Sequence, residues 1–298
     1  MSSPRPPSQL RGRPLRNTTC PYCGILLNEL LRTKEHVIGR RFVPKGALEN
    51  QWNLILLTCR PCNQRKADLE DDISAITMHF HAAGLSSMSD ARLQTEAKRR
   101  GQRSGSRKTG KPVASSDESL EVTAPLFNAG ELKVAFAAPA QLDDARAFEL
   151  ARLQMLGFFY FITYQDDLAV GHTWPGGFFP VHGTIKSDWG NPVHRAFMKE
   201  TATWDYRFVL NSASGYYRAI IRRHPSLVCW SWAVEWNDAY RLVGFLGEEP
   251  AAQSVANLLP RIPVRLLKQG QNRWLRFRTE EPLGESEDTL FIVPDSDA

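Results

Sequence analysis

Residues that could bind a metal ion or move a proton are concentrated near the N-terminus. Four cysteines form two Cys-x-x-Cys pairs, Cys20 with Cys23 and Cys59 with Cys62. In a reducing compartment such pairs are typical of a structural zinc site, in which four thiolates surround one ion. The spacing therefore predicts a zinc ion that clamps both ends of residues 24–58.

Further polar groups lie between the two pairs and just after them. The segment reads EHVIGRRFVPKGALENQWNLILLTCRPCNQRK from Glu35 to Lys66. A carboxylate and an imidazole precede a loop with proline and glycine, Asn53 precedes the apolar run LILLT, and Asn63 follows the last cysteine. Apolar residues recur at helical spacing from Leu69 to Phe80, which predicts a helix there. The order strand, loop, strand and helix is a ββα unit.

These motifs resemble those of the HNH endonucleases. The resemblance is carried by CPYC, EHVIG, Asn53 and CRPCNQRK, and it covers residues 20–68. This chain has Glu35 before His36 where the family more often has aspartate, and Asn63 where the family often has histidine, as in its HNN members. The resemblance implies a small ββα-metal (HNH) domain framed by two zinc knuckles.

The resemblance also implies catalytic roles for His36 and Asn53. An imidazole with an ordinary pKa near 6.5 suits a general base that takes a proton from water, and Asn53 would tie the loop across the two strands. Glu35 and Asn63 would hold a catalytic Mg²⁺ or Mn²⁺, because both ions prefer oxygen ligands. The expected activity is metal-dependent hydrolysis of phosphodiester bonds, with restriction and phage defence among the open settings.

Four basic residues near these groups are candidates for contacts with nucleic acid. Lys66 follows Asn63 by one helical turn, so the two side chains should share a side of the helix and meet a phosphate. The other candidates are Arg40, Arg41 and Arg65. We expect DNA as the partner in preference to RNA, and we leave open a homodimer, which could cut both strands.

Composition divides the chain into four parts. Residues 1–17 are rich in Pro, Arg and Ser and predict a flexible arm, residues 18–85 form the HNH domain with its zinc, and residues 86–122 form a basic linker. Residues 123–298 predict an α+β domain with an antiparallel sheet and an acidic C-terminal tail. The fold class is therefore α+β. The role of the second domain is left open among target recognition, sensing of a ligand or protein partner, and assembly.

The second domain contains one long apolar stretch and several strand-like runs. Residues 142–164 predict a buried helix, and WDYRFVL, GYYRAIIRR, LVCWSWAVEW and YRLVGFLG predict four strands joined by short turns. Trp230, Trp232 and Trp236 would share one face of a strand. That face could stack bases, but an aromatic core is the favoured interpretation, and Cys229 is expected to be a buried apolar residue.

Charge and hydropathy limit the class of protein. The net charge is +5, with eight Lys or Arg and one acid between Arg92 and Lys111 and with seven acids and no base from Thr279 to Ala298. The basic strip favours a polyanionic partner. The N-terminus lacks an apolar signal region, and the longest apolar run, Met155–Tyr164, is about half of the roughly 20 residues of a membrane span. We expect a soluble, cytoplasmic protein without membrane contact.

Two other functions compete with the nuclease. A non-catalytic zinc-ribbon module would bind nucleic acid through the basic strip and would be indifferent to replacement of His36. Alternatively, the aromatic C-terminal domain would be a ligand sensor that activates the nuclease.

Overall fold

The computed structural model describes residues 13–82, 91–116, 118–126, 130–138, 142–174, 177–262, 265–269, 273–277 and 279–293. Its α-helices are α1 (Arg60–Ala82), α2 (Ala91–Arg103), α3 (Asp144–Ile162), α4 (Pro192–Thr201) and α5 (Glu249–Ala256). The first strands are β1 (Arg13–Pro14), β2 (Arg32–His36), β3 (Leu54–Cys59), β4 (Glu118–Leu126), β5 (Gly130–Ala138) and β6 (Phe178–Ile185). The others are β7 (Asp205–Ser212), β8 (Tyr217–Arg223), β9 (Cys229–Trp236), β10 (Tyr240–Gly247), β11 (Arg265–Gln269) and β12 (Arg273–Phe277).

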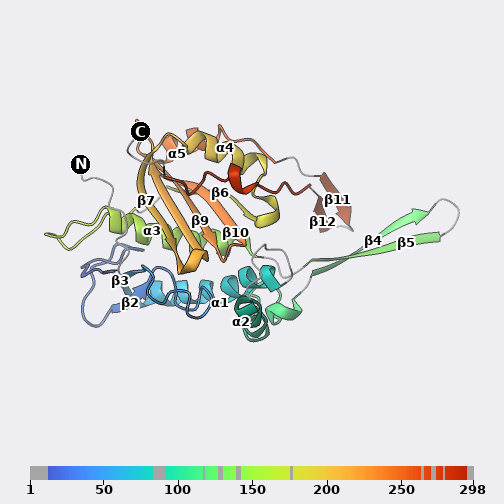
Figure 1. The fold of residues 1–298 in the computed structure, drawn as a ribbon, viewed down its shortest axis with the longest axis horizontal. Coiled ribbons are helices and arrows are strands. Elements are labelled where there is room, and N and C mark those ends of the chain that lie inside the picture. The colour runs from blue at the N-terminus through green and yellow to red at the C-terminus, as the bar shows by residue number, and fades with distance from the viewer. Residues whose placement is uncertain are drawn as a thin grey trace.

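A five-stranded antiparallel sheet is the largest feature of the fold. Its order is β6-β10-β9-β8-β7, so β7 to β10 form the predicted meander and β6 adds a strand beside β10. Helix α3 covers one face, with the β2, β3 and α1 unit beyond it, and α4 and α5 cover the other (Figure 1). The β4–β5 hairpin projects from this body (Figure 1). The fold is mixed α and β with an antiparallel sheet, as predicted.

Alternation along β9 sends neighbouring side chains into two different cores. Trp232 and Trp236 are fully buried against α3, and Trp230 packs partly buried on the same cluster. Cys229 is buried in the second core, between the sheet and the helices α4 and α5. The aromatic-core interpretation is confirmed, and the three tryptophans do not form an exposed base-stacking platform.

The N-terminal unit shares the first core with the sheet. Its short sheet has the order β1-β3-β2, and Trp52, which precedes β3, lies 6.4 Å from Phe158 of α3 and 6.0 Å from Phe208 of β7 between ring centroids. Ser212 Oγ donates to the Trp52 carbonyl over 2.6 Å. The loop between β2 and β3 is therefore fixed to residues more than a hundred positions away in the chain.

Two predicted flexible segments are ordered where the structure describes them. Within the predicted linker, α2 packs against α1 and buries Leu93 and Ala97, so residues 91–116 are a packed element and not a linker. Within the predicted arm, residues 1–12 lie outside the described residues, but Arg13–Pro14 pair with β3 and Asn17 is buried. Leu93 and Ala97 are four positions apart and therefore lie on one side of α2, and these two apolar residues anchor the helix on α1.

The described part of the acidic tail is bound to the C-terminal sheet and to α4. Arg241 lies 2.6 Å from Asp288, Arg195 lies 3.2 Å from Glu287, and Arg222 donates to the carbonyl of Leu290 over 2.7 Å. Residues 279–293, named the C-terminal strap here, are therefore held away from the basic strip. None of the helices in the described ranges is long and apolar enough to cross a bilayer.

Candidate functional site

The four cysteines form a cluster that could hold a metal ion such as zinc. Their sulfur atoms all lie within 4.8 Å of one another, and the Sγ atoms of Cys23 and Cys59 are 3.7 Å apart. A tetrahedral site with Zn–S bonds of about 2.3 Å has sulfur–sulfur edges of about 3.8 Å. Among the described residues no other group of three His, Cys, Asp or Glu side chains is close enough to bind an ion.

The cluster joins an N-terminal turn to the junction of β3 and α1. In the turn, Gly24 adopts φ +75° and donates to the Cys20 carbonyl, while Cys20 donates to the carbonyl of Ile25. Cys59 ends β3, and Cys62 lies in the first turn of α1. A hydrogen bond from the Cys62 thiol lowers the pKa of Cys20 to about 5, which favours a thiolate there, whereas the same hydrogen bond raises the pKa of Cys62 and burial raises that of Cys23 to about 11.

Strand β2 presents its last two residues to different surroundings. It pairs antiparallel with β3, with Glu35 opposite Leu56 and His36 opposite Ile55. Because successive strand residues point to opposite sides, the Glu35 side chain is buried toward α1 while His36 is half-buried and faces a pocket. The two residues that the sequence places side by side are therefore separated by the strand.

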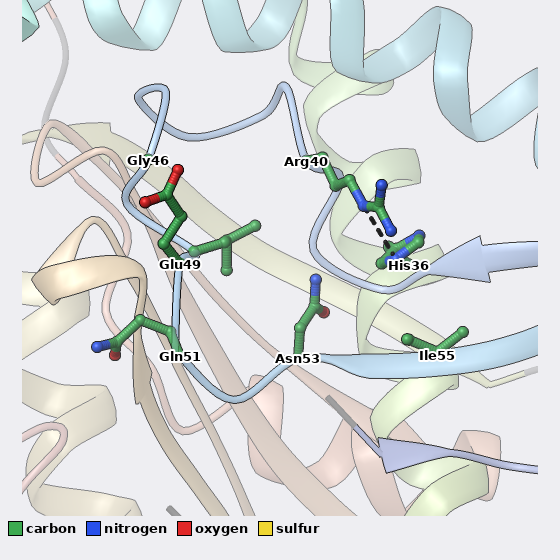
Figure 2. A pocket seen from close by; sticks show the side chains of 8 residues that line it. His36, Arg40, Gly46, Glu49, Gln51, Asn53 and Ile55 are labelled. Atoms are coloured by element: carbon green, nitrogen blue, oxygen red, sulfur yellow. Dashed lines mark hydrogen bonds between the residues drawn. The ribbon is translucent and has the colours of Figure 1, made fainter. Parts of the chain in front are cut away.

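The His36 pocket has a volume of about 350 Å³. It lies between the end of β2, the loop 39–52 and the start of β3, and Figure 2 shows its lining residues: His36, Arg40, Gly46, Leu48, Glu49, Gln51, Asn53 and Ile55. Arg40 Nε donates to His36 Nε2 over 3.2 Å. Burial, followed by the charges of Arg40, Lys66 and Lys34, lowers the pKa of His36 below its ordinary value of 6.5. The shift favours the neutral imidazole, the form that a general base requires.

Asn53 joins the two ends of the loop between β2 and β3, as the resemblance implied. Its Nδ2 donates to the Ile38 carbonyl over 2.8 Å, and its Oδ1 accepts from the Ile38 amide over 3.2 Å. The side chain is buried, so both bonds are shielded from water. Asn53 thereby fixes the backbone two residues after His36.

Glu35 belongs to a buried ion cluster beneath the pocket. Lys66 Nζ lies 2.6 Å from the Glu35 carboxylate and 2.5 Å from that of Glu70, and it donates to the His36 carbonyl over 3.0 Å. Burial alone would lower the pKa of Lys66, but Glu70 and Glu35 hold it above its ordinary value. Burial raises the pKa of Glu70. Gly39 donates to this carboxylate, and a Cβ at position 39 would lie 2.1 Å from it, so the contact requires glycine.

This cluster corrects one prediction and bears on a second. Lys66 is fully buried, so it is not a surface contact for phosphate. The predicted Mg²⁺ or Mn²⁺ site is not supported, because Lys66 already neutralises Glu35; Asn63 Nδ2 donates to Thr33 Oγ1 and to the Lys34 carbonyl, and its Oδ1 takes no part in these two bonds. Neither Glu35 nor Asn63 lines the His36 pocket. The helical spacing placed Lys66 near Asn63 correctly but did not indicate which side of α1 faces the hairpin.

The three predicted arginines differ in their positions. Arg40 lines the pocket and is exposed. Arg41 is exposed as well, but its carbonyl accepts from Ser74 Oγ and from Arg100. Arg65 lies outside the pocket lining and pairs with Glu149 over 3.1 Å. Only Arg40 is thus placed to share a ligand with His36.

Several residues of the site were not identified in the sequence. Glu49 and Gln51 line the pocket, and they belong to the loop between the two predicted strands, which was recognisable only by its proline and glycine. Helix α2 braces the same loop, because Glu96 accepts from the Lys45 amide and Arg100 donates to the Arg41 carbonyl. No sequence signal connected the basic strip with this loop.

Comparisons with family models, with curated proteins and with solved structures found no match for this chain.

Proposed function

We propose that the protein is an HNH-type endonuclease that hydrolyses phosphodiester bonds in DNA, with His36 as the general base. The observation that carries the proposal is an imidazole with a lowered pKa that faces a pocket beside an arginine. The strand, loop, strand and helix around it and the adjacent four-cysteine cluster are consistent with the motifs of the sequence.

The proposed reaction begins when a DNA phosphate enters the pocket. Arg40 forms charge-assisted hydrogen bonds with the phosphate, which is a stronger partner for a guanidinium than a neutral imidazole is. His36 Nε2 is then free to take a proton from water. The water oxygen forms a bond with phosphorus, the bond from phosphorus to the 3′ oxygen breaks, and the leaving oxygen takes a proton from solvent.

The proposal includes zinc in the four-cysteine cluster, as a structural ion. Metal analysis of the purified protein should then find one zinc per chain, and Cys59→Ser should lose zinc and fold poorly. Full zinc content in that variant would refute the site. The resemblance also implies a catalytic Mg²⁺ or Mn²⁺, but no step of the reaction is assigned to it, because Lys66 occupies the position beside Glu35.

The experiment is cleavage of supercoiled plasmid by the wild type, by His36→Ala and by the matched control His172→Ala, each with Mg²⁺, Mn²⁺ or EDTA. His172 is exposed and packs on Phe159 and Trp174, away from the pocket lining. Open-circle or linear DNA from the wild type and the control, but not from His36→Ala, is the expected result. Cleavage that persists in EDTA would exclude the divalent ion, and cleavage that requires Mg²⁺ or Mn²⁺ would require Lys66 to move.

A second candidate function is a non-catalytic module that binds nucleic acid. It is favoured by Lys98, Arg99 and Arg103, which are exposed on α2. Binding of plasmid without cleavage under every condition, and equal binding by His36→Ala, would favour this module over the nuclease.

A further inference from the structure

The His36 pocket has two walls with different chemistry. His36 and Arg40 form one wall at the end of β2, and Glu49 and Gln51 belong to the other wall, on the loop that leads into β3 (Figure 2). The apolar side chains of Leu48 and Ile55 also line the pocket, whose volume is that of a small-ligand site.

The charges of the two walls select different parts of a nucleotide. Arg40 attracts a phosphate, whereas the carboxylate of Glu49 repels one. A carboxylate accepts hydrogen bonds, and the donors on the major-groove edge of the bases are the amino groups of cytosine and adenine. The Gln51 amide can both donate and accept, and aliphatic side chains can contact a sugar or the face of a base. The second wall therefore suits a nucleobase that follows the phosphate into the pocket.

The loop that carries Glu49 and Gln51 is held rigidly enough to read a base. Asn50 adopts φ +58° between them, a conformation that asparagine tolerates better than most residues. The Glu49 amide donates to the Gly46 carbonyl and the Gln51 amide to the Leu48 carbonyl.

Contacts from distant elements hold the two ends of the same loop. Asn237 donates to the Phe42 carbonyl over 3.2 Å, and Ser212 donates to the Trp52 carbonyl over 2.6 Å. Side chains presented from a fixed backbone can discriminate between bases, because less conformational entropy is lost on binding.

We propose that Glu49 and Gln51 read the nucleobase next to the scissile phosphate, and that Glu49 selects bases that present an amino group on their major-groove edge. This inference rests on the proposed function. On that edge cytosine and adenine offer an amino donor to the carboxylate, whereas thymine and guanine offer a carbonyl oxygen, which the carboxylate repels; the amino group of guanine lies on the minor-groove edge. The nuclease should therefore prefer C or A over T or G at one position beside the cut.

The test uses DNA with a randomised segment, and the ends of the products are sequenced for the wild type, Glu49→Gln, Gln51→Leu and the control Glu29→Gln. Glu29 is a matched carboxylate with a side chain that is 88% exposed and outside the pocket. Base frequencies are normalised within each variant. We expect about tenfold enrichment of C and A at one position in the wild type and the control, and a loss or reversal in Glu49→Gln, because an amide can donate to a carbonyl.

A binding measurement separates this inference from the nuclease itself. In the His36→Ala protein, a short oligo-dC should bind more tightly than oligo-dT, and the added Glu49→Gln change should remove the difference. Base-dependent binding without any wild-type cleavage would support base reading and refute the nuclease. Equal affinity for the two oligonucleotides, identical cleavage profiles of wild type and Glu49→Gln, or complete loss of cleavage in Glu49→Gln with unchanged base-dependent binding would overturn the role of Glu49 as a base reader.

Discussion

Two buried clusters in different halves of the molecule each place one cation between two carboxylates. The lysine cluster consists of Glu35, Lys66 and Glu70, and the arginine cluster consists of Glu235, Arg241 and Asp288. Lys66 and Arg241 are both fully buried. The charge patterns are similar, although Glu235 also pairs with Arg218 over 2.6 Å, but the groups that each cluster holds in place are different.

The lysine cluster is bonded to the backbone around the His36 pocket. Lys66 donates to the His36 carbonyl, and Glu70 accepts from the amide of Gly39. The compact ammonium group meets two carboxylates and a carbonyl from three directions. A change in this cluster should therefore alter the position of His36, the proposed general base, as well as the stability of the fold.

The arginine cluster is bonded to the C-terminal strap. Arg241 lies 2.7 Å from Glu235 on the neighbouring strand and 2.6 Å from Asp288 of the strap, and its guanidinium lies 3.8 Å from the ring centroid of Trp189. Planar guanidinium groups suit this combination of paired carboxylates and aromatic stacking. The cluster is remote from the His36 pocket, so it should contribute stability alone.

The largest expected effect is that of Lys66→Met. Removal of the cation leaves two buried carboxylates without a partner, which should lower the free energy of unfolding by about 3–5 kcal/mol. Cleavage by the molecules that remain folded should also fall sharply, because the His36 carbonyl loses its donor. Urea unfolding and cleavage at low temperature measure the two effects, and cleavage equal to that of the wild type would contradict the link between this cluster and the pocket.

Arg241→Met should lower stability without an effect on cleavage. The free energy of unfolding should fall by less than in Lys66→Met, because Glu235 keeps Arg218 as a partner over 2.6 Å, and proteolysis should then cut the strap more readily. Cleavage per folded molecule should match that of the wild type at a temperature where the variant is folded. A large loss of activity there would show that the two clusters are not separate.

Asn53→Ala should have an intermediate effect. It leaves the amide and carbonyl of Ile38 without partners in a buried site, at a cost of about 1–3 kcal/mol in unfolding free energy. The rate of cleavage should also fall, because Asn53 fixes the backbone next to His36. The control Asn257→Ala, in the exposed turn after α5, should leave the unfolding free energy and the cleavage rate unchanged. Equal stability of the two variants in urea would refute the tie.

The pH dependence of cleavage distinguishes the clusters further. Because the pKa of His36 is lowered from its ordinary value of 6.5, the rate should fall at low pH with a midpoint below 6.5, by about tenfold per unit once the imidazole is protonated. Lys66 is one of the charges that lower this pKa, so Lys66→Met should move the midpoint upward and Arg241→Met should not. A wild-type midpoint above 6.5 would contradict this assignment.

Exposed charges should have the smallest effect. Replacement of Lys98, Arg99 and Arg103 of α2 by alanine should leave stability nearly unchanged, because surface ion pairs contribute little. If α2 contacts DNA, the log–log dependence of affinity on salt should become shallower by about one per residue. Lys199→Ala, on the far side of the sheet, is the control, and an unchanged slope in the triple variant would exclude α2 from the contact.

Local sequence signals predicted the elements that depend on neighbours in the chain. Cysteine spacing identified the four-thiol cluster, alternation identified the meander and the tryptophan face, and helical periodicity identified α1 and α3. The Asn53 tie was expected from the resemblance to the HNH motifs, and the two hydrogen bonds with Ile38 make it.

The features that the sequence did not predict depend on contacts between segments that are distant in the chain. The buried position of the Lys66 ammonium group is determined by Glu35 on β2 and by Glu70, one helical turn later on α1. A helical wheel does not show which side of α1 meets the β2–β3 hairpin. Helix α2 is anchored by Leu93 and Ala97 on α1, although its composition is typical of a linker. Glu49 faces the pocket because residues far along the chain fix its loop.

Chemical rescue of His36→Gly tests the central claim most directly. The variant should cleave labelled DNA far more slowly than the wild type, and added imidazole should restore part of the rate in proportion to its unprotonated fraction. His172→Gly should show neither the loss nor the rescue. Cleavage by His36→Gly at the wild-type rate, with no response to imidazole, would contradict the assignment of His36 as the general base.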